Sequence, residues 1–599
     1  MNAKKASLEL AVIGNGQVAG LLDSAGRLVW ACLPRPDSDP TMCALLTRAG
    51  SEAADGIFAI ALSDQAQQQQ RYLRNTAIVE TRLTGAGGSE IRIIDFCPRF
   101  QQLGRMFRPM MFIRIVEPLH GRAHVRMRFK PSIDYGRRPA EITVGNHHLS
   151  FALVDQACRL TTDASLAALL EERVVVLDAP VAFLLGPDES VEQQPLSLAH
   201  SFLDQTQHYW QEWVRSLAVP ADWQDAVIRS AITLKLCTFD DSGAVLSALT
   251  TSIPEAEHTV RNWDYRYCWL RDSYFVIQAL NRLGATRTME GFLRYIGNIV
   301  AQSTAGALQP LYGITGNPQL QERIVTTLDG YRGIGPVRVG NAAFEQRQHD
   351  VYGAVILAAS QNFYDARLTA PGDIALFTQL EELGRHAAEL FEQPDAGPWE
   401  YRGQEQVHTY PAVMCWAGCD RLARIARHLQ LPERAQFWRE HADAMRPRIL
   451  QRAWNPRRNA IVDRFDGDQL DATALLLPEL GFLPASDERF VATLAAIERE
   501  LRVGDLVFRY RHDDDFGSPA NAFTICSFWY VNALAAVGRT DEARAVFERL
   551  LGRRNALGLF SEDIDPVSGE HWGNYPQTYS MVGIIFSALR LSRSWDEIL

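Results

Sequence analysis

The chain has 599 residues, and this length predicts two or more domains, because a single hydrophobic core seldom serves more than about 300 residues. Its composition is that of a globular protein, with 47% hydrophobic residues, 22% charged residues and a net charge of −11. This acidic balance argues against nucleic acid or an anionic membrane as a partner, since both are bound through basic patches.

The N-terminus and the cysteines indicate a cytoplasmic protein. Residues 1–10 contain two lysines but no apolar segment of the kind that a secretory signal has. No apolar run approaches the roughly 18 residues that a transmembrane helix needs. The nine cysteines are scattered and lie mostly in apolar segments, which is typical of reduced, buried thiols.

Residues 1–196 are predicted to form an antiparallel β-sandwich. Short β-rich runs are separated there by Gly, Pro, Asp and Asn, and about ten strands at such spacing favour a sandwich. The polar loop 34–40 is rich in proline; it is either a simple turn or a segment that reaches a ligand held by the next domain. The clearest strands are 27–31, 57–62, 77–83, 90–96, 110–117, 123–130, 148–154 and 173–178.

A linker helix is predicted at 197–221, where apolar residues recur with helical spacing and no flexible Gly/Ser run is present. From residue 222 to 599 nearly every periodic segment is helical. The expected helices are 222–240, 273–285, 287–302, 349–366, 375–392, 407–429, 431–452, 471–480, 485–501, 519–538, 540–552 and 577–593.

Short and long connections alternate between these helices. Short links join helices into antiparallel hairpins, so all the long links are expected on one face of the domain. Six hairpins closed in a ring make an (α/α)6 barrel. An open solenoid is the alternative, but its repeats would resemble one another in sequence and these do not.

The long links carry unusual clusters of aromatic and charged residues. Residues 261–272 combine Trp, Tyr, Arg and Asp in twelve positions directly before a helix. Flat apolar faces beside paired donors and acceptors suit a sugar ring with its hydroxyl groups. Further clusters surround Arg338, Trp399 and Arg509, which predicts a sugar-binding rim.

Cleavage of an acetal needs one protonated carboxyl group as the acid and one ionised carboxylate as the base or nucleophile. Glu400 directly follows Trp399, whose apolar face would favour the protonated form. Glu562 lies just before the last long helix and can supply the base. No motif for a serine nucleophile, a nucleotide phosphate or zinc is present, so we expect neither a cofactor nor a metal.

At these positions the sequence resembles glycoside hydrolase family 15, the inverting glucoamylase and trehalase-like enzymes. The resemblance spans essentially the whole chain and implies a β-sandwich followed by an (α/α)6 barrel. It implies Glu400 as general acid and Glu562 as general base. It also implies a clamp for the terminal glucose, and with the neighbouring rim residues the expected sugar-binding set is Tyr265, Tyr267, Trp269, Arg271, Asp272, Arg338, Trp399, Arg402, Arg509 and Tyr510.

One departure from the family affects the expected substrate. Trehalase-like members often carry a Ser-Lys step after His-Thr, whereas here His408 and Thr409 lead into Tyr410 and Pro411. We therefore expect an exo-acting, glucoamylase-like hydrolase that releases β-glucose from an α-glucan or α-glucobiose. The alternatives are an α,α-trehalase, a glycoside phosphorylase and a non-catalytic sugar-binding protein, and a homo-oligomer is left open.

Overall fold

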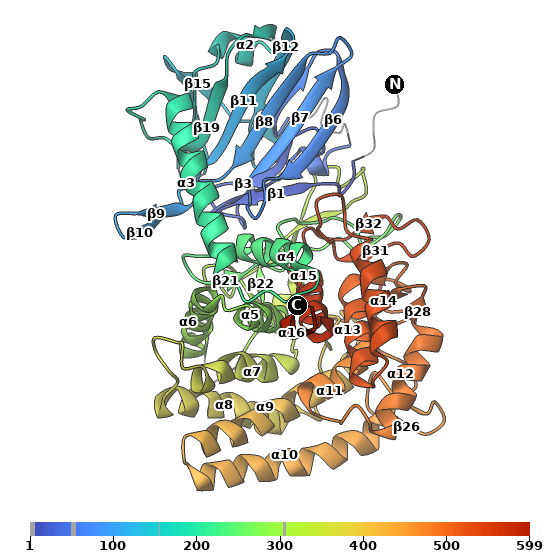
Figure 1. Cartoon of the computed structure of the whole chain (residues 1–599). Coiled ribbons are helices and arrows are strands. Elements are labelled where there is room, and N and C mark those ends of the chain that lie inside the picture. The colour runs from blue at the N-terminus through green and yellow to red at the C-terminus, as the bar shows by residue number, and fades with distance from the viewer. Residues whose placement is uncertain (1–5, 49–54, 155, 304–306, 599) are drawn as a thin grey trace.

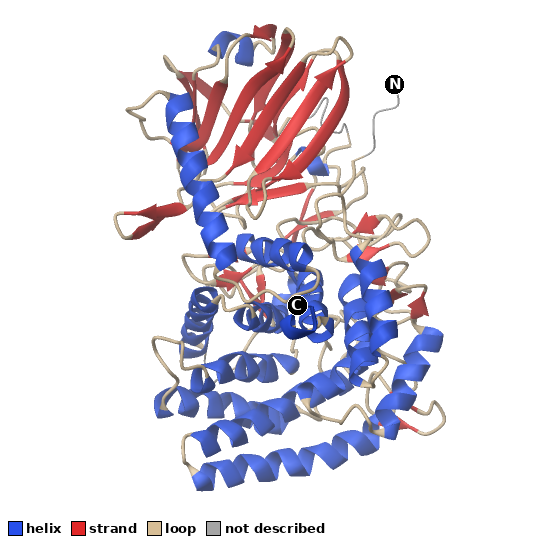
Figure 2. Cartoon of the chain, viewed as in Figure 1, coloured by secondary structure: helices blue, strands red, loops and turns tan. Residues whose placement is uncertain are grey.

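The computed structural model describes residues 6–48, 55–154, 156–303 and 307–598. It has a sandwich of two antiparallel sheets above a ring of helices, and one long helix runs from the first part to the second (Figure 1; Figure 2). The predicted fold class is confirmed. No helix in these ranges is long and apolar enough to cross a membrane.

The first sheet of the sandwich has seven strands in the order β1-β2-β3-β5-β12-β18, with β4 paired to β3. Strand β12 alternates buried and exposed residues, because one face lies on the core and the other faces solvent. The strands are β1 (Ala11–Gly14), β2 (Ala19–Leu22), β3 (Leu28–Cys32), β4 (Pro40–Met42), β5 (Ile57–Leu62), β12 (Ala123–Lys130) and β18 (Val174–Leu177).

The second sheet has eight strands in the order β15-β16-β17-β19-β11-β8-β7-β6. Apolar side chains from both sheets, Phe58, Phe129 and Phe183 among them, fill the space between them. The strands are β6 (Gln65–Tyr72), β7 (Val79–Gly85), β8 (Glu90–Phe96), β11 (Phe112–His120), β15 (Ile142–Val144), β16 (His148–Ala152), β17 (Ala157–Thr162) and β19 (Val181–Pro187).

Helix α3 (Pro195–Arg215) leaves the sandwich and leads into the barrel, where the predicted linker helix was expected. The helices of the barrel are α4 (Gln224–Leu236), α5 (Leu270–Arg282), α6 (Thr286–Gln302), α7 (Asp350–Tyr364), α8 (Ile374–Leu390), α9 (Thr409–His428), α10 (Pro432–Ala453), α11 (Leu477–Leu480), α12 (Glu488–Glu500), α13 (Thr524–Ala536), α14 (Thr540–Leu551) and α15 (Thr578–Leu591).

The inner helices close a ring. Helix α5 packs on α7, α7 on α9, α9 on α11, the 3-10 segment before α11 on α13, α13 on α15, and α15 again on α5. The inner helices α7, α9, α13 and α15 are buried almost throughout, whereas the outer helices α6, α10, α12 and α14 bury one face. The long links between hairpins therefore meet at one end of the ring, as the alternation of link lengths predicted.

Several helix boundaries differ from the predictions, and three of the differences change the type or the start of an element near the site. The segment predicted at 471–480 is a 3-10 helix, Ala472–Leu476, followed by the single turn α11. Helix α13 begins at Thr524 instead of 519, because Ala522–Phe523 form a strand. Helix α5 begins at Leu270, so Arg271 and Asp272 lie in its first turn and not in the preceding loop.

One hydrophobic cluster spans the junction between the sandwich and the barrel, in addition to the core between the two sheets. Leu10, Trp30 and barrel residues such as Trp572 belong to a single buried cluster. The indole N–H of Trp30 donates to the carbonyl of Leu249 at 2.8 Å. All nine cysteines are buried and unpaired.

Candidate active site

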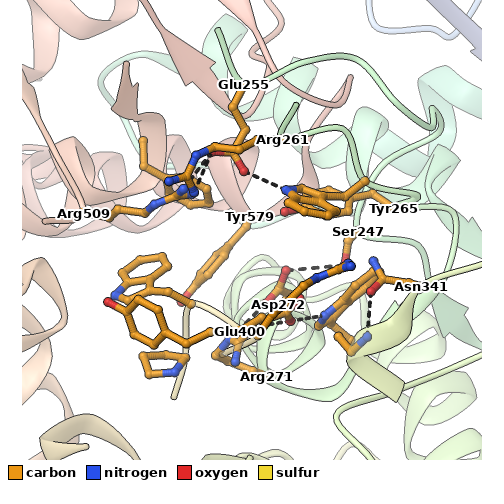
Figure 3. A pocket seen from close by; sticks show the side chains of 18 of the residues that line it. Ser247, Glu255, Arg261, Tyr265, Arg271, Asp272, Asn341, Glu400, Arg509 and Tyr579 are labelled. Carbon is orange, nitrogen blue, oxygen red and sulfur yellow. Dashed lines mark hydrogen bonds and ion pairs between the residues drawn. The ribbon is translucent and has the colours of Figure 1, made fainter. Parts of the chain in front are cut away.

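The long links converge on a cavity of about 790 Å³, counting the space at its mouth. Most of the sugar-binding residues predicted from the sequence line it, and they come from links that are far apart in the chain. Figure 3 shows two groups on opposite walls, one around Arg271, Asp272 and Glu400 and the other around Glu255 and Arg509. The predicted residues on the walls are Tyr265, Trp269, Arg271, Asp272, Trp399, Glu400, Arg402 and Arg509.

The first turn of α5 places Arg271 and Asp272 on one wall. Strand β22 (Cys268–Trp269) pairs with β23 (Leu311–Tyr312) and fixes the direction from which the chain enters the helix. The guanidinium of Arg271 donates to Gln348 at 2.9 Å and to Asp350 at 3.3 Å. Those two residues precede and open α7, so a neighbouring inner helix holds the Arg271 side chain in place.

Asp272 is only 8% exposed and keeps acceptor capacity for a ligand. Burial raises the pKa of its carboxyl group to about 6, Arg271 opposes the rise, and the charge of Glu400 adds to it. Ser247 donates to Oδ2 at 3.4 Å, while Oδ1 lies 3.4 Å from Nε of Arg271. An arginine and a carboxylate fixed side by side can bind two neighbouring hydroxyl groups of a sugar.

Glu400 lies on the same wall and receives two donors. The indole N–H of Trp269 donates to its Oε1 at 2.5 Å, and Nη2 of Arg271 lies 3.4 Å from the same oxygen. Its backbone has φ of 63°, in the left-handed region that non-glycine residues rarely adopt. Strain of this kind is found where a side chain must be aimed, and here it directs the carboxyl group into the cavity.

Trp399 does not supply the contact that the sequence suggested for Glu400. Its indole N–H donates to Oδ2 of Asp471 at 2.6 Å, and its ring lies 5.4 Å from that of Phe523. Trp269, which is far from Glu400 in the chain, provides the indole contact instead.

Glu562 is fully buried directly before β31 (Asp563–Ile564). The backbone N–H of Asn574 donates to its Oε2 at 3.3 Å, whereas Oε1 has no hydrogen-bond partner among the described residues. A side chain at Gly573, which has φ of 74°, would come within 2.7 Å of Oε2, so glycine is needed there. Burial raises the pKa of Glu562, and the neighbouring charge of Glu255 raises it further.

Tyr265 connects the two candidate catalytic carboxyl groups. Burial raises the pKa of its phenol, and the charges of Glu562, Glu255 and Glu400 raise it further, so the hydroxyl stays protonated. Its ring contacts the ring of Trp269 edge-on, with 5.1 Å between centroids. The hydroxyl of Tyr265 therefore interacts electrostatically with Glu400 on one side and with Glu255 and Glu562 on the other.

A charged cluster around Glu255 forms the second wall, and Arg509 is its one member in the predicted sugar-binding set. Nη2 of Arg509 lies 2.7 Å from Oε2 of Glu255, and the indole N–H of Trp263 donates to Oε1 of Glu255 at 2.9 Å. Arg261 pairs with Asp514 and donates to the carbonyl of Gly517 at 2.5 Å. Arg261 and Trp263 belong to the segment 261–272 already singled out, but Glu255 follows a proline in a stretch with no recognisable pattern.

Three predicted sugar-binding residues lie behind the walls of the cavity. The hydroxyl of Tyr267 accepts a hydrogen bond from the backbone N–H of Gly340 at 3.2 Å. Arg338 donates to two backbone carbonyls at 2.9 Å and lies over the ring of Trp263, while Tyr510 donates to Asp514. These side chains support residues of the wall and do not line it.

The loop 34–40 also reaches the site from behind. The guanidinium of Arg266 donates to the carbonyl of Ser38 at 2.6 Å and pairs with Asp264 at 2.8 Å. Asp39 accepts from the backbone N–H of Tyr135 at 2.8 Å. No residue of this loop lines the cavity, so it supports the segment 261–272 and does not contact a bound sugar.

Further wall residues outside the predicted set include polar and aromatic side chains at the start of α15 and in the link before α7: Asn341, Gln577 and Tyr579. Gln577 ends the run Gly-Asn-Tyr-Pro-Gln at 573–577, and this aromatic and polar run directly before a helix was the available signal. Among the described residues no group of three or more His, Cys, Asp or Glu side chains is arranged to hold a metal ion.

Comparison with known proteins defines the class. Residues 221–589 match the model of Glycosyl hydrolases family 15, and residues 3–162 match the domain described as Trehalase-like, N-terminal. The family match covers more than half of the chain. The chain therefore belongs to glycosyl hydrolase family 15 and is a glycoside hydrolase.

Two relatives are similar over nearly their whole length. The protein named Trehalase from Mycobacterium tuberculosis is 32% identical over 624 residues, which cover 98% of this chain and 90% of that protein. The protein named Trehalase from Thermoplasma volcanium is 31% identical over 607 residues, covering 97% and 93%. A bacterial glucoamylase complexed with acarbose has the same fold, with a TM-score of 0.71, 14% identity and coverage of 99% and 94%.

Proposed function

We propose that the chain hydrolyses α,α-trehalose to two glucose molecules by a single inverting displacement. One observation carries the catalytic part of this proposal: Glu400 and Glu255 lie on opposite walls of one site, and Glu562, which is fully buried and does not itself line the cavity, interacts with Glu255. An inverting glycosidase needs its acid and its base on opposite faces of the sugar.

The proposed roles follow from the contacts. Glu400 gives its proton to the glycosidic oxygen, which leaves with the second glucose. Glu562 takes a proton from a water molecule whose oxygen attacks the anomeric carbon from the other face, so the product keeps the inverted configuration. The buried, unpartnered Oε1 of Glu562 is available to accept a hydrogen bond from that water.

Binding of the terminal glucose is assigned to the wall around α5. Trp269 supplies an apolar face, and Arg271 and Asp272 bind hydroxyl groups. Because Gln348 and Asp350 fix Arg271 before substrate arrives, little side-chain freedom is lost on binding. Tyr265 is proposed to orient the water beside Glu562.

The relatives favour trehalose over the glucoamylase-type substrate that the sequence analysis preferred. Both relatives described above bear the name Trehalase and match this chain over at least 90% of their own length. The glucoamylase likeness is at 14% identity and bears on the fold alone. The expected preference for an α-glucan is therefore replaced by its alternative, α,α-trehalase.

The residues that replaced the Ser-Lys step do not oppose this assignment. Tyr410 is 3% exposed in the first turn of α9, and its phenol interacts with Asp350 and Arg271. Tyr410 is thus beside the residues that support the terminal-glucose clamp, and neither Tyr410 nor Pro411 lines the cavity.

The direct test is glucose release from a panel of trehalose, maltose, isomaltose, kojibiose and maltooligosaccharides. We expect trehalose to give the highest kcat/KM, and a preference for maltooligosaccharides would restore the glucoamylase assignment. NMR of the first turnovers is expected to show one β-glucose and one α-glucose from each trehalose in water. Label from H₂¹⁸O should enter the β-anomer, and label in the α-anomer would exclude inversion.

The phosphorylase alternative is tested in the same assay. Turnover that requires phosphate and yields glucose phosphate would identify a phosphorylase, in which Glu562 would be dispensable. A cytoplasmic location is retained as a proposal, because nine buried and unpaired cysteines suit a reducing compartment.

A further inference from the structure

A second polar pocket lies beside the catalytic cavity, on the far side of Tyr401. Tyr401, Asp514 and Asp515 line both spaces. The second pocket encloses about 530 Å³, counting the space at its mouth. The ring of Tyr401 stacks on His408, with 5.4 Å between centroids and 14° between planes, and its hydroxyl lies 3.2 Å from Nε2 of His512. The side chain of Tyr401 therefore separates the two spaces, and its contacts with His408 and His512 hold it in place.

Several polar side chains of this pocket have no partner among the described residues. Nε2 of His408 and Oδ1 of Asp463 are buried without a hydrogen bond, in residues that are only 5% and 6% exposed. The guanidinium of Arg464 next to them makes no ion pair or side-chain hydrogen bond with the described chain. The side-chain amides of Gln404 and Gln406 also make no hydrogen bond with the described chain.

Unpartnered buried groups are uncommon because water or protein atoms usually satisfy them. The other charged residues of the pocket are already engaged. Asp515 accepts from the backbone N–H groups of Arg402 and Gly403 at 2.6 and 2.9 Å, and Asp513 accepts from the hydroxyl of Ser518. The polar groups that make no hydrogen bond are therefore concentrated around His408, Asp463 and Arg464.

The character of these groups suits a neutral, hydroxylated ligand. Burial lowers the pKa of His408 to about 4, so the imidazole is neutral at pH 7. Burial raises the pKa of Asp463 to about 7, and the charge of Asp471 adds to the rise. The second pocket thus combines an aspartate, an arginine and an aromatic ring. The catalytic cavity has the same combination in Asp272, Arg271 and Trp269.

We propose that this pocket is a second sugar-binding site, which takes a hexose against Asp463, Arg464 and the edge of Tyr401. Glucose is the sugar named here because the proposed function releases it beside Glu400, the residue that precedes Tyr401. The inference rests on the proposed function only in that choice. A glucose held there lies one side chain away from the catalytic cavity.

The test is a calorimetric titration of the full-length protein with D-glucose. We expect two glucose molecules per chain for the wild type. Asp463→Asn and Arg464→Gln are each expected to weaken one site about tenfold, since each removes a charge-assisted hydrogen bond. Both variants should keep the KM for trehalose, because neither residue lines the catalytic cavity.

Matched variants locate the two sites. Asp272→Asn is expected to weaken the catalytic site and leave the second one unchanged, and the Asp272→Asn/Asp463→Asn pair should weaken both sites. Asp443→Asn on α10, whose side chain is 67% exposed, is the control and should bind two. One glucose per wild-type chain, or loss of all binding in Asp272→Asn alone, would overturn the second site.

Failure of the proposed function gives a different result. A chain that binds two glucose molecules but does not hydrolyse trehalose would keep the pocket and reject the trehalase assignment. A chain that hydrolyses trehalose but binds a single glucose, with no effect of Asp463→Asn or Arg464→Gln, would keep the trehalase assignment and reject the second sugar-binding site. The thermal midpoint of each variant shows whether it is folded. If either Asp463→Asn or Arg464→Gln does not fold, the other variant still tests the site.

Discussion

The two candidate catalytic carboxyl groups lie in different environments, since Glu400 lines the cavity and Glu562 does not. Glu400 has a side chain that is 21% exposed, and it is approached by the indole of Trp269 and the guanidinium of Arg271. Glu562 is fully buried, has one backbone donor and has acidic neighbours in Glu255 and Asp563.

This difference suits the two roles that are proposed for these glutamates. A carboxyl group that is open to the cavity can exchange its proton with the substrate and then with water. A carboxyl group in an enclosed acidic environment gains proton affinity, which strengthens it as a base once it is ionised. The predictions below test this contrast, beginning with the largest expected effect.

The first prediction concerns the glutamates themselves. Glu400→Gln and Glu562→Gln should each lower kcat for trehalose at least about a hundredfold, because each removes a general acid or a general base. Steady-state kinetics at a single pH measures the loss. Glu405→Gln, a nearby exposed glutamate paired with Arg347, is the control and should stay close to wild type.

A substrate with a better leaving group separates the two roles. α-Glucosyl fluoride needs little protonation of its leaving group, so Glu400→Gln should regain most of its activity on it. Glu562→Gln should stay inactive, since water must still be deprotonated. Equal recovery in both variants would contradict the assigned roles.

The second prediction tests the clamp on the Glu400 wall. Asp272→Asn and Arg271→Lys should lower kcat/KM roughly ten- to a hundredfold, because each weakens a charge-assisted hydrogen bond to a sugar hydroxyl. Arg282→Lys at the other end of the same helix should have no effect on kinetics. A clamp variant with unchanged kcat/KM would remove that residue from substrate binding.

The third prediction concerns the environment of Glu562. The base must be ionised, so activity falls as pH drops through its pKa, and a raised pKa moves that acidic limb of the pH profile upward. Glu255→Gln removes a negative charge and should move the limb to lower pH. Tyr265→Phe removes a hydroxyl group that lowers the pKa of Glu562, so it should move the limb to higher pH.

The profile of kcat/KM against pH measures both shifts. On the acidic limb Tyr265→Phe should cost about fivefold, equivalent to one ordinary hydrogen bond. Shifts in the same direction for both variants, or none, would show that Glu562 does not control the limb.

The smallest effects are expected behind the walls. Tyr267→Phe removes the hydroxyl that accepts from Gly340, so it should lower the free energy of unfolding by about 1 kcal/mol. The KM for trehalose should stay within about twofold, since no contact to the sugar is lost. A large rise in KM with unchanged stability would show that Tyr267 contacts the sugar.

Much of the fold could be predicted because hydrophobic periodicity acts locally. The inner helices α7 and α13 are apolar over most of their length, and the alternation of link lengths predicted a common rim. The prediction failed where a contact between distant parts of the chain, or a proline, overrode periodicity. Ala522–Phe523 pair with β31 as a strand, and Pro478 interrupts what was expected to be a full helix.

The site was less predictable because contacts between distant links determine it. Trp269 and Arg271 were identifiable from their cluster, but no local pattern shows that their partner is Glu400 rather than a sequence neighbour. Glu255 was missed because a single glutamate in a loop is usually solvated, and only the fold brings it to Arg509. Tyr267 was overestimated because residues next to a binding residue in sequence can point away from the site.

The contact between Arg266 and the carbonyl of Ser38 has a consequence for interpreting sequence variants. Ser38 belongs to the sandwich and lies far in sequence from either glutamate, yet it holds the segment that carries Trp269 and Arg271. A substitution in the first forty residues can therefore appear in an assay as a loss of turnover in a protein that is fully folded. Screens of inactive alleles should not exclude this region as remote from catalysis.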